Sequence, residues 1–293
     1  MGFTEECAEG WNSVDGILVI NLDTSIERWE KFKQENASAL PMEKVERVSG
    51  VVGVNVGGYG RSPWFTERTG ERARYWAGCA GCTLAHRRAI ERAKEKGWRN
   101  VLIFEDDVLV DKCLGTLLDT FLPKLPQSYL FYAGYSRPTP FGRCLSRAGQ
   151  HSVWKVEGVL STFAYIVPQS MYELLLARLP IESDVWEWLS IHRAVDNFYR
   201  DEISAMPGVS AYVLHPDAVV VQEGASDVSG AAGVLNYNNF ADAPHRVMSI
   251  GGLLHILAAP YRRLKRRLNS IRTHRRALRG GFPGLRKKRR PKA

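Results

Sequence analysis

Three consecutive carboxylates, Glu105, Asp106 and Asp107, separate two apolar runs at residues 101–104 and 108–110. The first run is rich in Val and Ile, a pattern that predicts a strand buried on both faces. Carboxylates at the end of such a strand are costly to desolvate unless a positive partner meets them. The simplest partner is a divalent cation such as Mg²⁺ or Mn²⁺, which binds through one or two carboxylates and substrate phosphates. The competing interpretation is a set of solvated acids, or an acidic first turn of the next helix.

The segments around these acids alternate between strands and helices. We expect strands at residues 17–22, 46–51, 101–104, 128–134, 153–156, 161–167, 212–216 and 218–222. We expect helices at residues 26–39, 76–96, 113–125, 168–178 and 184–199. Residues 53–72 are rich in glycine and exceed most structural connections in length, so we expect a functional loop there. This alternation predicts an open α/β sheet, in which ligands bind beyond the carboxyl ends of strands.

Charge is distributed unevenly along the 293 residues. Residues 260–293 hold 15 of the 40 Lys and Arg and no acid, so the remaining 25 face all 31 Asp and Glu. Residues 1–259 therefore carry a net charge of −6, although the whole chain carries +9. The overall basic charge describes the end of the chain and does not by itself indicate nucleic-acid binding.

Five cysteines form an odd and sparse set, which argues against a disulfide framework and for a reducing compartment. Cys79 and Cys82 have the spacing of a redox or zinc motif. A zinc site needs a second pair of ligands, which His86 alone does not supply. We therefore expect these two cysteines to be buried thiols. The N-terminal residues do not resemble a signal peptide, and no apolar stretch is long enough to span a bilayer.

The end of the chain combines an apolar stretch at residues 247–259 with basic runs at 262–267 and 286–290. An apolar patch beside a basic cluster suits an anionic membrane surface, where each basic residue contributes about 1 kcal/mol. The alternative is a disordered, solubilising tail. Nucleic-acid binding is not expected, because aromatic side chains for base stacking are nearly absent there.

Several of these motifs together resemble glycosyltransferase family 25, which includes lipopolysaccharide-biosynthesis enzymes and collagen β-galactosyltransferases. The resemblance covers about residues 16–228 and is strongest at residues 102–108. Its other parts are residues 19–23 with Glu27 and Arg28, residues 81–86, residues 162–167, Val195 with Asp196, and Gln222 with Ser226 and Asp227. Ala85 departs from the pattern, because the family usually has Ser at that position.

The resemblance implies a GT-A-like, nucleotide-sugar-binding fold: an open mixed sheet flanked by helices. It also implies transfer of a sugar with inversion, galactose from UDP-galactose being the expected donor, to a hydroxyl of a lipopolysaccharide, capsule or other glycan acceptor. A divalent cation, Mn²⁺ in preference to Mg²⁺, is expected to neutralise the diphosphate leaving group. We expect this cation to bind Asp107, Glu105 and His215.

The remaining site residues divide between donor and acceptor. Donor-binding residues are expected to be Asn21, Arg28, His86, Glu105 and Asp106, with Arg28 meeting the diphosphate. For Arg28 a solvated helix charge is the alternative, and for His86 a structural role. An inverting transfer needs a base for the acceptor hydroxyl. Asp196 is the candidate from the resemblance and Glu187 a second one, with a surface carboxylate as the alternative for Asp196.

These interpretations predict three regions: an N-terminal extension at residues 1–15, a catalytic domain at 16–245 and an apolar-basic tail at 246–293. The expected partners are a UDP-sugar, a glycan or lipid-linked acceptor and, through the tail, an anionic membrane surface, with no nucleic acid. We expect a cytoplasmic protein, peripheral on the inner face of the membrane if the tail binds lipid. The alternative function is a non-catalytic protein of the same fold that binds a glycan or a partner.

Overall fold

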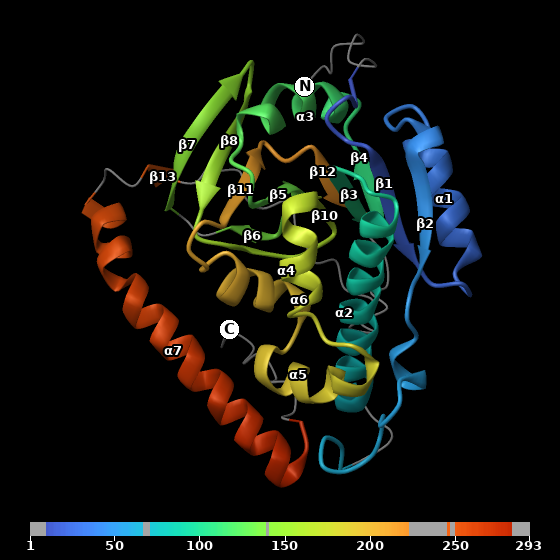
Figure 1. Ribbon diagram of the computed structural model, residues 1–293, viewed down its shortest axis with the longest axis vertical. Coiled ribbons are helices and arrows are strands. Elements are labelled where there is room, and N and C mark those ends of the chain that lie inside the picture. The colour runs from blue at the N-terminus through green and yellow to red at the C-terminus, as the bar shows by residue number, and fades with distance from the viewer. Residues whose placement is uncertain (1–9, 67–70, 139–140, 223–244, 247–249, 283–293) are drawn as a thin grey trace, which may run out of the picture.

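The computed structural model describes residues 10–66, 71–138, 141–222, 245–246 and 250–282. Three predicted features fall outside these ranges: most of the N-terminal extension (1–9), the pair Ser226 and Asp227, and the basic run 286–290. Figure 1 shows a central sheet covered by helices, with the long helix α7 (Ile250–Gly280) along its outer side.

A mixed sheet forms the centre of the fold. Its strands are β1 (Gly16–Asn21), β2 (Val45–Ser49), β3 (Asn100–Glu105), β5 (Tyr129–Gly134), β7 (Phe141–Ala148), β8 (His151–Val156), β10 (Ala164–Pro168), β11 (Ser210–His215) and β13 (His245–Arg246). Within the described residues its order is β13-β7-β8-β11-β5-β10-β3-β1-β2. β1 is parallel to β2 and β3, whereas β10 runs antiparallel between β3 and β5. The beginning of β10 therefore lies beside the end of β3.

Two short pairs of strands lie beside the main sheet. β4 (Val108–Val110) pairs with β12 (Val219–Val221), and β6 (Arg137–Pro138) pairs with β9 (Val159–Leu160). The backbone N–H of Gln222, just past β12, donates to the carbonyl of Asp107 at 2.7 Å. The turn that carries the acids is therefore held from both sides.

Helices cover both faces of the sheet because successive residues of its central strands, which point to opposite faces, are apolar. The helices are α1 (Ile26–Asn36), α2 (Glu71–Glu95), α3 (Leu114–Phe121), α4 (Tyr172–Leu176), α5 (Val185–His192), α6 (Val195–Phe198) and α7. Val101 and Ile103 of β3 join the core that includes α2, α4, α5 and α6. Leu102 and Phe104 join the opposite core, which includes residues of α1 and α3. Each fully buried side chain of this size contributes about 1.5–3 kcal/mol, so the position of β3 is strongly fixed.

The predicted fold class, an open mixed α/β sheet flanked by helices, is confirmed. Two local predictions are wrong. No strand is among the expected ones between residues 134 and 153, but β6 lies there, and so does β7, which pairs with β8. The sequence of β7 is polar, as is usual for a strand near a sheet edge, so it shows no apolar run. The helix expected at residues 184–199 is broken into α5 and α6 at Arg193, whose φ is +74°.

The cysteines follow the sequence prediction only in part. Cys79, Cys82 and Cys144 are free thiols, and burial raises the pKa of both Cys79 and Cys82. Cys113 is disulfide-bonded, which the odd and sparse set of cysteines did not predict.

α7 is a continuous helix of 31 residues that packs against α5. It is anchored at its carboxyl end, where Ala277 and Phe282 are fully buried. The backbone N–H of Phe282 donates to the carbonyl of Trp64 at 2.7 Å, and the Phe282 ring stacks on Trp76 of α2. Gly281 follows the helix with a φ of +73°, the left-handed conformation that often ends helices. This end of α7 is therefore integrated into the core.

Candidate active site

The three acids lie where the central strand β3 ends. Glu105 is the last residue of β3, and Asp106 and Asp107 form the turn into β4. The backbone N–H of Glu105 donates to the carbonyl of Phe163 at 3.0 Å, just before β10. The buried side chain of Asn36 fixes β4 by donating to the carbonyl of Val108 at 3.0 Å and accepting from the N–H of Val110 at 2.9 Å. The turn is thus held rigidly at the carboxyl edge of the sheet.

A cleft of about 310 Å³ opens over this turn. Five of the predicted residues line it: Arg28, His86, Glu105, Asp106 and Asp107. One wall is the loop 50–54, and the other is the face of α2 that carries Cys82 and Ala85. The structure therefore brings together residues that are separated by up to 79 positions in the sequence.

Glycines allow the two walls to approach each other closely. A Cβ added at Gly53 would lie 1.7 Å from the carbonyl oxygen of Ala77, and one at Gly81 would lie 2.1 Å from the carbonyl oxygen of Val51. No side chain fits at these distances. Of the loop expected at residues 53–72, Gly53 and Val54 belong to this wall of the cleft.

Asp106 belongs to an internal network with Arg28 and Asn21. The Arg28 guanidinium forms an ion pair with Asp106, whose side chain is only 7% exposed. The Asn21 side-chain amide donates to Asp106 at 2.6 Å and to the carbonyl of Ser25 at 3.0 Å. Asn21 itself is 1% exposed. These contacts make Asn21 and Asp106 well suited to hold Arg28 at the cleft.

Asp107 is in a different environment from its neighbour. Its Oδ1 atom is buried and has no hydrogen-bond partner, and its Oδ2 atom lies 3.4 Å from the Arg28 guanidinium. Burial, together with the charge of Glu105, raises the pKa of Asp107 to about 7 against the opposing charge of Arg28. A buried carboxylate oxygen without a partner is the position that a cation would satisfy. Asp107 and Glu105 therefore fit a divalent cation.

His86 is buried in α2 and faces Glu105. One ring nitrogen lies 3.0 Å from the Tyr165 hydroxyl; the other lies 3.2 Å from the Thr162 hydroxyl and 3.7 Å from a Glu105 carboxylate oxygen. Ligand atoms of Cys82, His86 and Glu105 all lie within 4.8 Å of one another. His86 is thus placed to orient Glu105.

Asp196 lies at the beginning of α6, beside the segment that joins β9 to β10. Its carboxylate accepts from the N–H of Asn197 at 2.6 Å and of Ser161 at 3.4 Å. Burial raises the pKa of Asp196, and the charge of Glu105 raises it as well. The N–H groups of Asn197 and Ser161 and the charge of Arg200 lower this pKa, but they offset only part of the increase. Residues 161–163 therefore connect the carboxylate of Asp196, the ring of His86 and the backbone of Glu105. Asp196 does not itself line the cleft.

The structure does not bring His215 to the acids. This residue ends β11, which β5 and β10 separate from β3. Its ring lies 3.2 Å from the Tyr135 hydroxyl, and it does not line the cleft. Strands are spaced about 4.8 Å apart, so three spacings put β11 about 14 Å from β3. Glu187, the second candidate base, is exposed on α5.

Sequence reasoning missed Arg74 in the cleft lining, and Thr162 and Tyr165 around His86. Thr162 and Tyr165 occur within a segment that reads as an ordinary strand. Arg74 precedes the expected start of its helix. An arginine at such a position would ordinarily be interpreted as a solvated surface residue. Only the fold shows that these side chains meet the site.

The first part of the chain matches a known protein family. Residues 14–146 match the model of glycosyltransferase family 25, described as LPS biosynthesis protein. The protein is a glycosyltransferase. The resemblance to family 25 that its motifs predicted is confirmed over this stretch, which contains Arg28, His86 and the three acids. Asp196 and His215 lie beyond it.

Other comparisons are weaker. No curated protein matches the chain in sequence. One similar solved structure is a glycosyltransferase involved in the glycosylation of the major capsid of PBCV-1, with 12% identity, a TM-score of 0.40, and coverage of 74% of this chain and 96% of that one. Another is described as mannose-1-phosphate geranyltransferase from Thermus thermophilus, with 12% identity, a TM-score of 0.35, and coverage of 69% and 74%. Scores this low carry no conclusion about substrate or mechanism.

Proposed function

We propose that this protein transfers a sugar from a nucleotide diphosphate donor, UDP-galactose being the expected one, to a hydroxyl of a lipopolysaccharide, capsule or other glycan acceptor. The observation that supports this most is Asp107, whose buried and unpartnered carboxylate oxygen lies beside Glu105 in a cleft at the end of the central strand. An isolated acidic cluster would be fully solvated, whereas this one is partly buried and lines a cavity large enough for part of a nucleotide sugar.

The cleft residues have different roles in binding the donor. Asp107 and Glu105 would hold a divalent cation, Mn²⁺ in preference to Mg²⁺, which when bound neutralises charge on the diphosphate. Arg28, oriented by Asp106 and Asn21, presents its guanidinium at the same edge, where it can donate to a phosphate oxygen. His86 lies 3.7 Å from the Glu105 carboxylate, close enough to help orient it.

Asp196 is the proposed base for an inverting transfer. As the acceptor oxygen forms its bond to the anomeric carbon, the bond from that carbon to the diphosphate breaks, and the hydroxyl proton passes to the Asp196 carboxylate. Burial raises the pKa of Asp196 above its ordinary value, which makes it a better proton acceptor than a solvated aspartate.

The test of this function is a thermal-shift screen of nucleotide sugars with and without Mn²⁺. We expect one donor to raise the melting temperature, because a ligand that binds only the folded state stabilises it. The increase should require the metal. If no nucleotide sugar binds under either condition, the non-catalytic alternative, a glycan- or partner-binding protein, is favoured instead.

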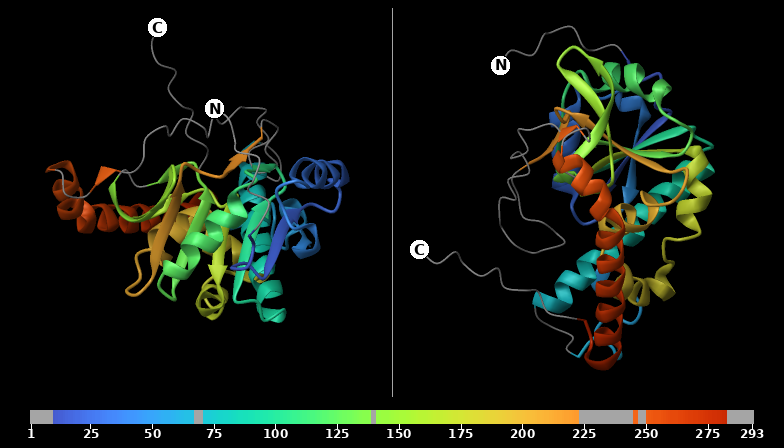
Figure 2. Two further views of the ribbon diagram at one scale, coloured as in Figure 1. Left: turned by 90° about the horizontal axis from the view of Figure 1, so that it is seen from above. Right: turned by 90° about the vertical axis from the view of Figure 1, so that its left-hand side faces the viewer.

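We further propose that the protein is peripheral on a membrane surface, bound through α7. The outward face of this helix carries exposed apolar side chains at intervals of three, four or seven residues: Leu254, Leu257, Tyr261, Leu264, Leu268, Ile271 and Leu278. Exposed cations flank them: Arg263, Lys265, Arg267, Arg272, Arg275, Arg276 and Arg279. Figure 2 shows that α7 runs along one side of the molecule.

Charge favours an anionic lipid surface over a second copy of the helix as the partner of this face. In a helix pair built on the apolar stripe, Lys265, Arg267, Arg272 and Arg279 would flank the seam and repel one another, because no acid lies among them. An amphipathic basic helix instead lies in the plane of a membrane interface. No helix within the described ranges combines the length and the apolar character needed to cross a bilayer.

Sedimentation with vesicles tests this attachment. We expect binding to phosphatidylcholine vesicles that contain phosphatidylglycerol, weaker binding at high salt, and loss of binding in Leu264→Ser/Leu268→Ser. The matched control is Leu145→Ser/Ile181→Ser, which changes two exposed apolar residues away from α7. Equal binding to neutral vesicles, or no binding by the wild type, contradicts the proposal.

A further inference from the structure

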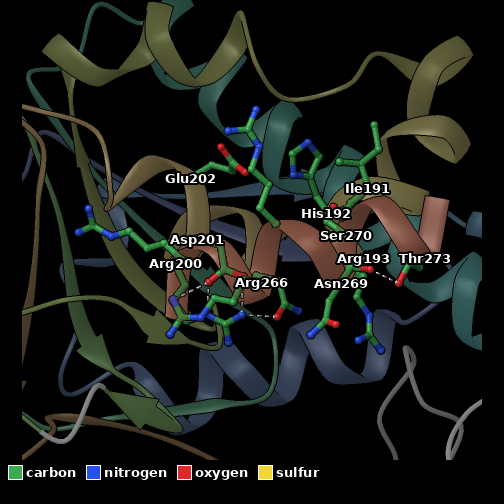
Figure 3. A pocket seen from close by; sticks show the side chains of 13 residues that line it. Ile191, His192, Arg193, Arg200, Asp201, Glu202, Arg266, Asn269, Ser270 and Thr273 are labelled. Atoms are coloured by element: carbon green, nitrogen blue, oxygen red, sulfur yellow. Dashed lines mark hydrogen bonds and ion pairs between the residues drawn. The ribbon is translucent and has the colours of Figure 1, made fainter. Parts of the chain in front are cut away.

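A second cavity, of about 540 Å³, lies between α7 and the segment that runs from α5 through α6. Figure 3 shows side chains from both sides converging on it. Five of its lining residues are arginines: Arg193, Arg200, Arg263, Arg266 and Arg267. The acids in its lining are Asp201 and Glu202. A concave site lined by more arginines than acids favours an anionic ligand.

Only part of this positive charge is neutralised within the protein. Asp201 accepts from Arg200 at 2.6 and 2.7 Å and from Arg266 at 3.0 Å. In the part of the chain that the structure describes, the guanidiniums of Arg193, Arg263 and Arg267 form no hydrogen bond or ion pair. These three arginines therefore have donors available to a ligand. Most basic surface residues are simply solvated, but these come from two separate elements and face one cavity.

The neighbouring histidine does not add to the charge. Burial lowers the pKa of His192 to about 4, although Asp201 opposes this shift. The ring is therefore neutral at neutral pH. The other polar groups of the lining are the amides of Asn197 and Asn269 and the hydroxyls of Ser270 and Thr273. Amides and hydroxyls suit sugar hydroxyl groups, whereas free guanidiniums suit phosphate.

The cavity adjoins the proposed base. Asn197 lines it, and the Asn197 side chain donates to Asp196 at 3.0 Å. Asp196 also accepts from the N–H of Ser161 at 3.4 Å, in the segment 161–163 that contacts His86 and Glu105 of the donor cleft. Asp196 therefore lies between the acidic cleft and the basic cavity. An acceptor must approach the base from a direction that the donor does not occupy.

We propose that this cavity binds the acceptor, and that the acceptor carries a phosphate monoester recognised by Arg193, Arg263 and Arg267. This inference rests on the proposed glycosyl transfer, because it assigns a substrate class to the second half of that reaction. A phosphate monoester carries a charge of about −1.5 to −2 at neutral pH, which matches the unneutralised guanidiniums better than a single carboxylate does. The phosphate belongs either to a phosphorylated sugar or to a lipid.

Binding of two probes to the full chain, without divalent metal, tests the proposal. The probes are glucose 1-phosphate and monomeric dihexanoyl phosphatidic acid, with glucose as the uncharged comparison. We expect at least one phosphate probe to bind, and Arg263→Ala/Arg267→Ala to weaken it about tenfold or more, because each charge-assisted hydrogen bond contributes substantially. The preferred probe distinguishes a sugar source of the phosphate from a lipid source.

The matched control is Arg61→Ala/Arg178→Ala, which removes two exposed arginines that do not line the cavity. Unchanged binding in this control, with loss in the cavity variant, supports the proposal. No binding to the wild type, or equal weakening in both variants, overturns it. UDP with Mn²⁺ is titrated into the same proteins. Failure of that binding in the wild type contradicts the proposed donor function, whereas its retention in the cavity variant shows that the fold is intact.

Discussion

The acidic cleft and the basic cavity of this protein are built in opposite ways. The cleft takes its three carboxylates from consecutive residues at the end of one buried strand. The cavity takes its arginines from α7 and from residues 193–200, separated by more than sixty positions in the sequence. The first arrangement is visible as a motif, whereas the second exists only because α7 packs on α5. The opposite charges also suit opposite ligands, a cation with its diphosphate on one side and a free anion on the other.

The largest effect is expected at the cleft. Asp107→Asn should lower the rate of sugar transfer by at least about 10³-fold, because it removes a carboxylate that would hold the metal. Loss of several kcal/mol of transition-state stabilisation lowers a rate by about that factor. The rate is measured as sugar transferred per enzyme at saturating donor. Glu30→Gln, an exposed acid outside the cleft, is the control and should not change the rate. A transfer rate within tenfold of the wild type in Asp107→Asn would contradict a metal site at Asp107.

Asp196 lies between the two regions. Its substitution should affect the chemical step of the reaction and not the binding of the donor. Asp196→Asn should lower kcat by about 10²- to 10³-fold while leaving the affinity for the donor unchanged. Since the base acts as the carboxylate and burial raises its pKa, kcat/KM should fall as the pH drops through a value above 3.8, the ordinary pKa of aspartate. This fall should be absent in Asp196→Asn. A wild-type profile that stays flat below pH 5 would contradict the assignment.

The basic cavity depends on the docking of α7, and Phe282 tests that docking. Phe282→Ala should lower the free energy of unfolding by about 3 kcal/mol, because the side chain is fully buried and stacks on Trp76. Urea unfolding measures the change. Leu278→Ala, on the exposed face of the same helix, should cost less than about 0.5 kcal/mol. Equal effects in the two variants would show that the end of α7 does not pack as described.

A carboxylate remote from both regions provides the smallest effect. Burial acts to raise the pKa of Asp119, but hydrogen bonds from the backbone and side chains of Asn12 and Ser13 outweigh it and hold the pKa below 3.8. The stability from these bonds is present above pH 4 and is lost as the pH falls through the lowered pKa. Asp119→Asn should therefore cost about 1 kcal/mol at pH 7 and less at pH 2. Urea unfolding at the two pH values checks this, and an equal cost at both would show that charge plays no part.

The sequence predicts this fold and cleft better than it predicts the cavity. Runs of Val, Ile and Leu identify β1, β3 and β10, because strands buried on both faces need continuous apolar sequence. The polar strand β7 has no such run and was missed. Glu105 and Asp107 were found because they are adjacent to a strand end, but the orienting role of Thr162 had no signal. His215 was expected at the metal because it ends a strand, and only the sheet order reveals that two strands intervene.

We propose that Asp107 and Glu105 together bind a divalent cation, which in turn binds the donor diphosphate. Calorimetric titration of UDP into the full-length protein, with Mn²⁺ and with the metal removed by chelation, tests it most directly. We expect binding with Mn²⁺ and a loss of at least tenfold in affinity without it. Equal affinity in the two titrations, or no binding in either, would contradict the claim.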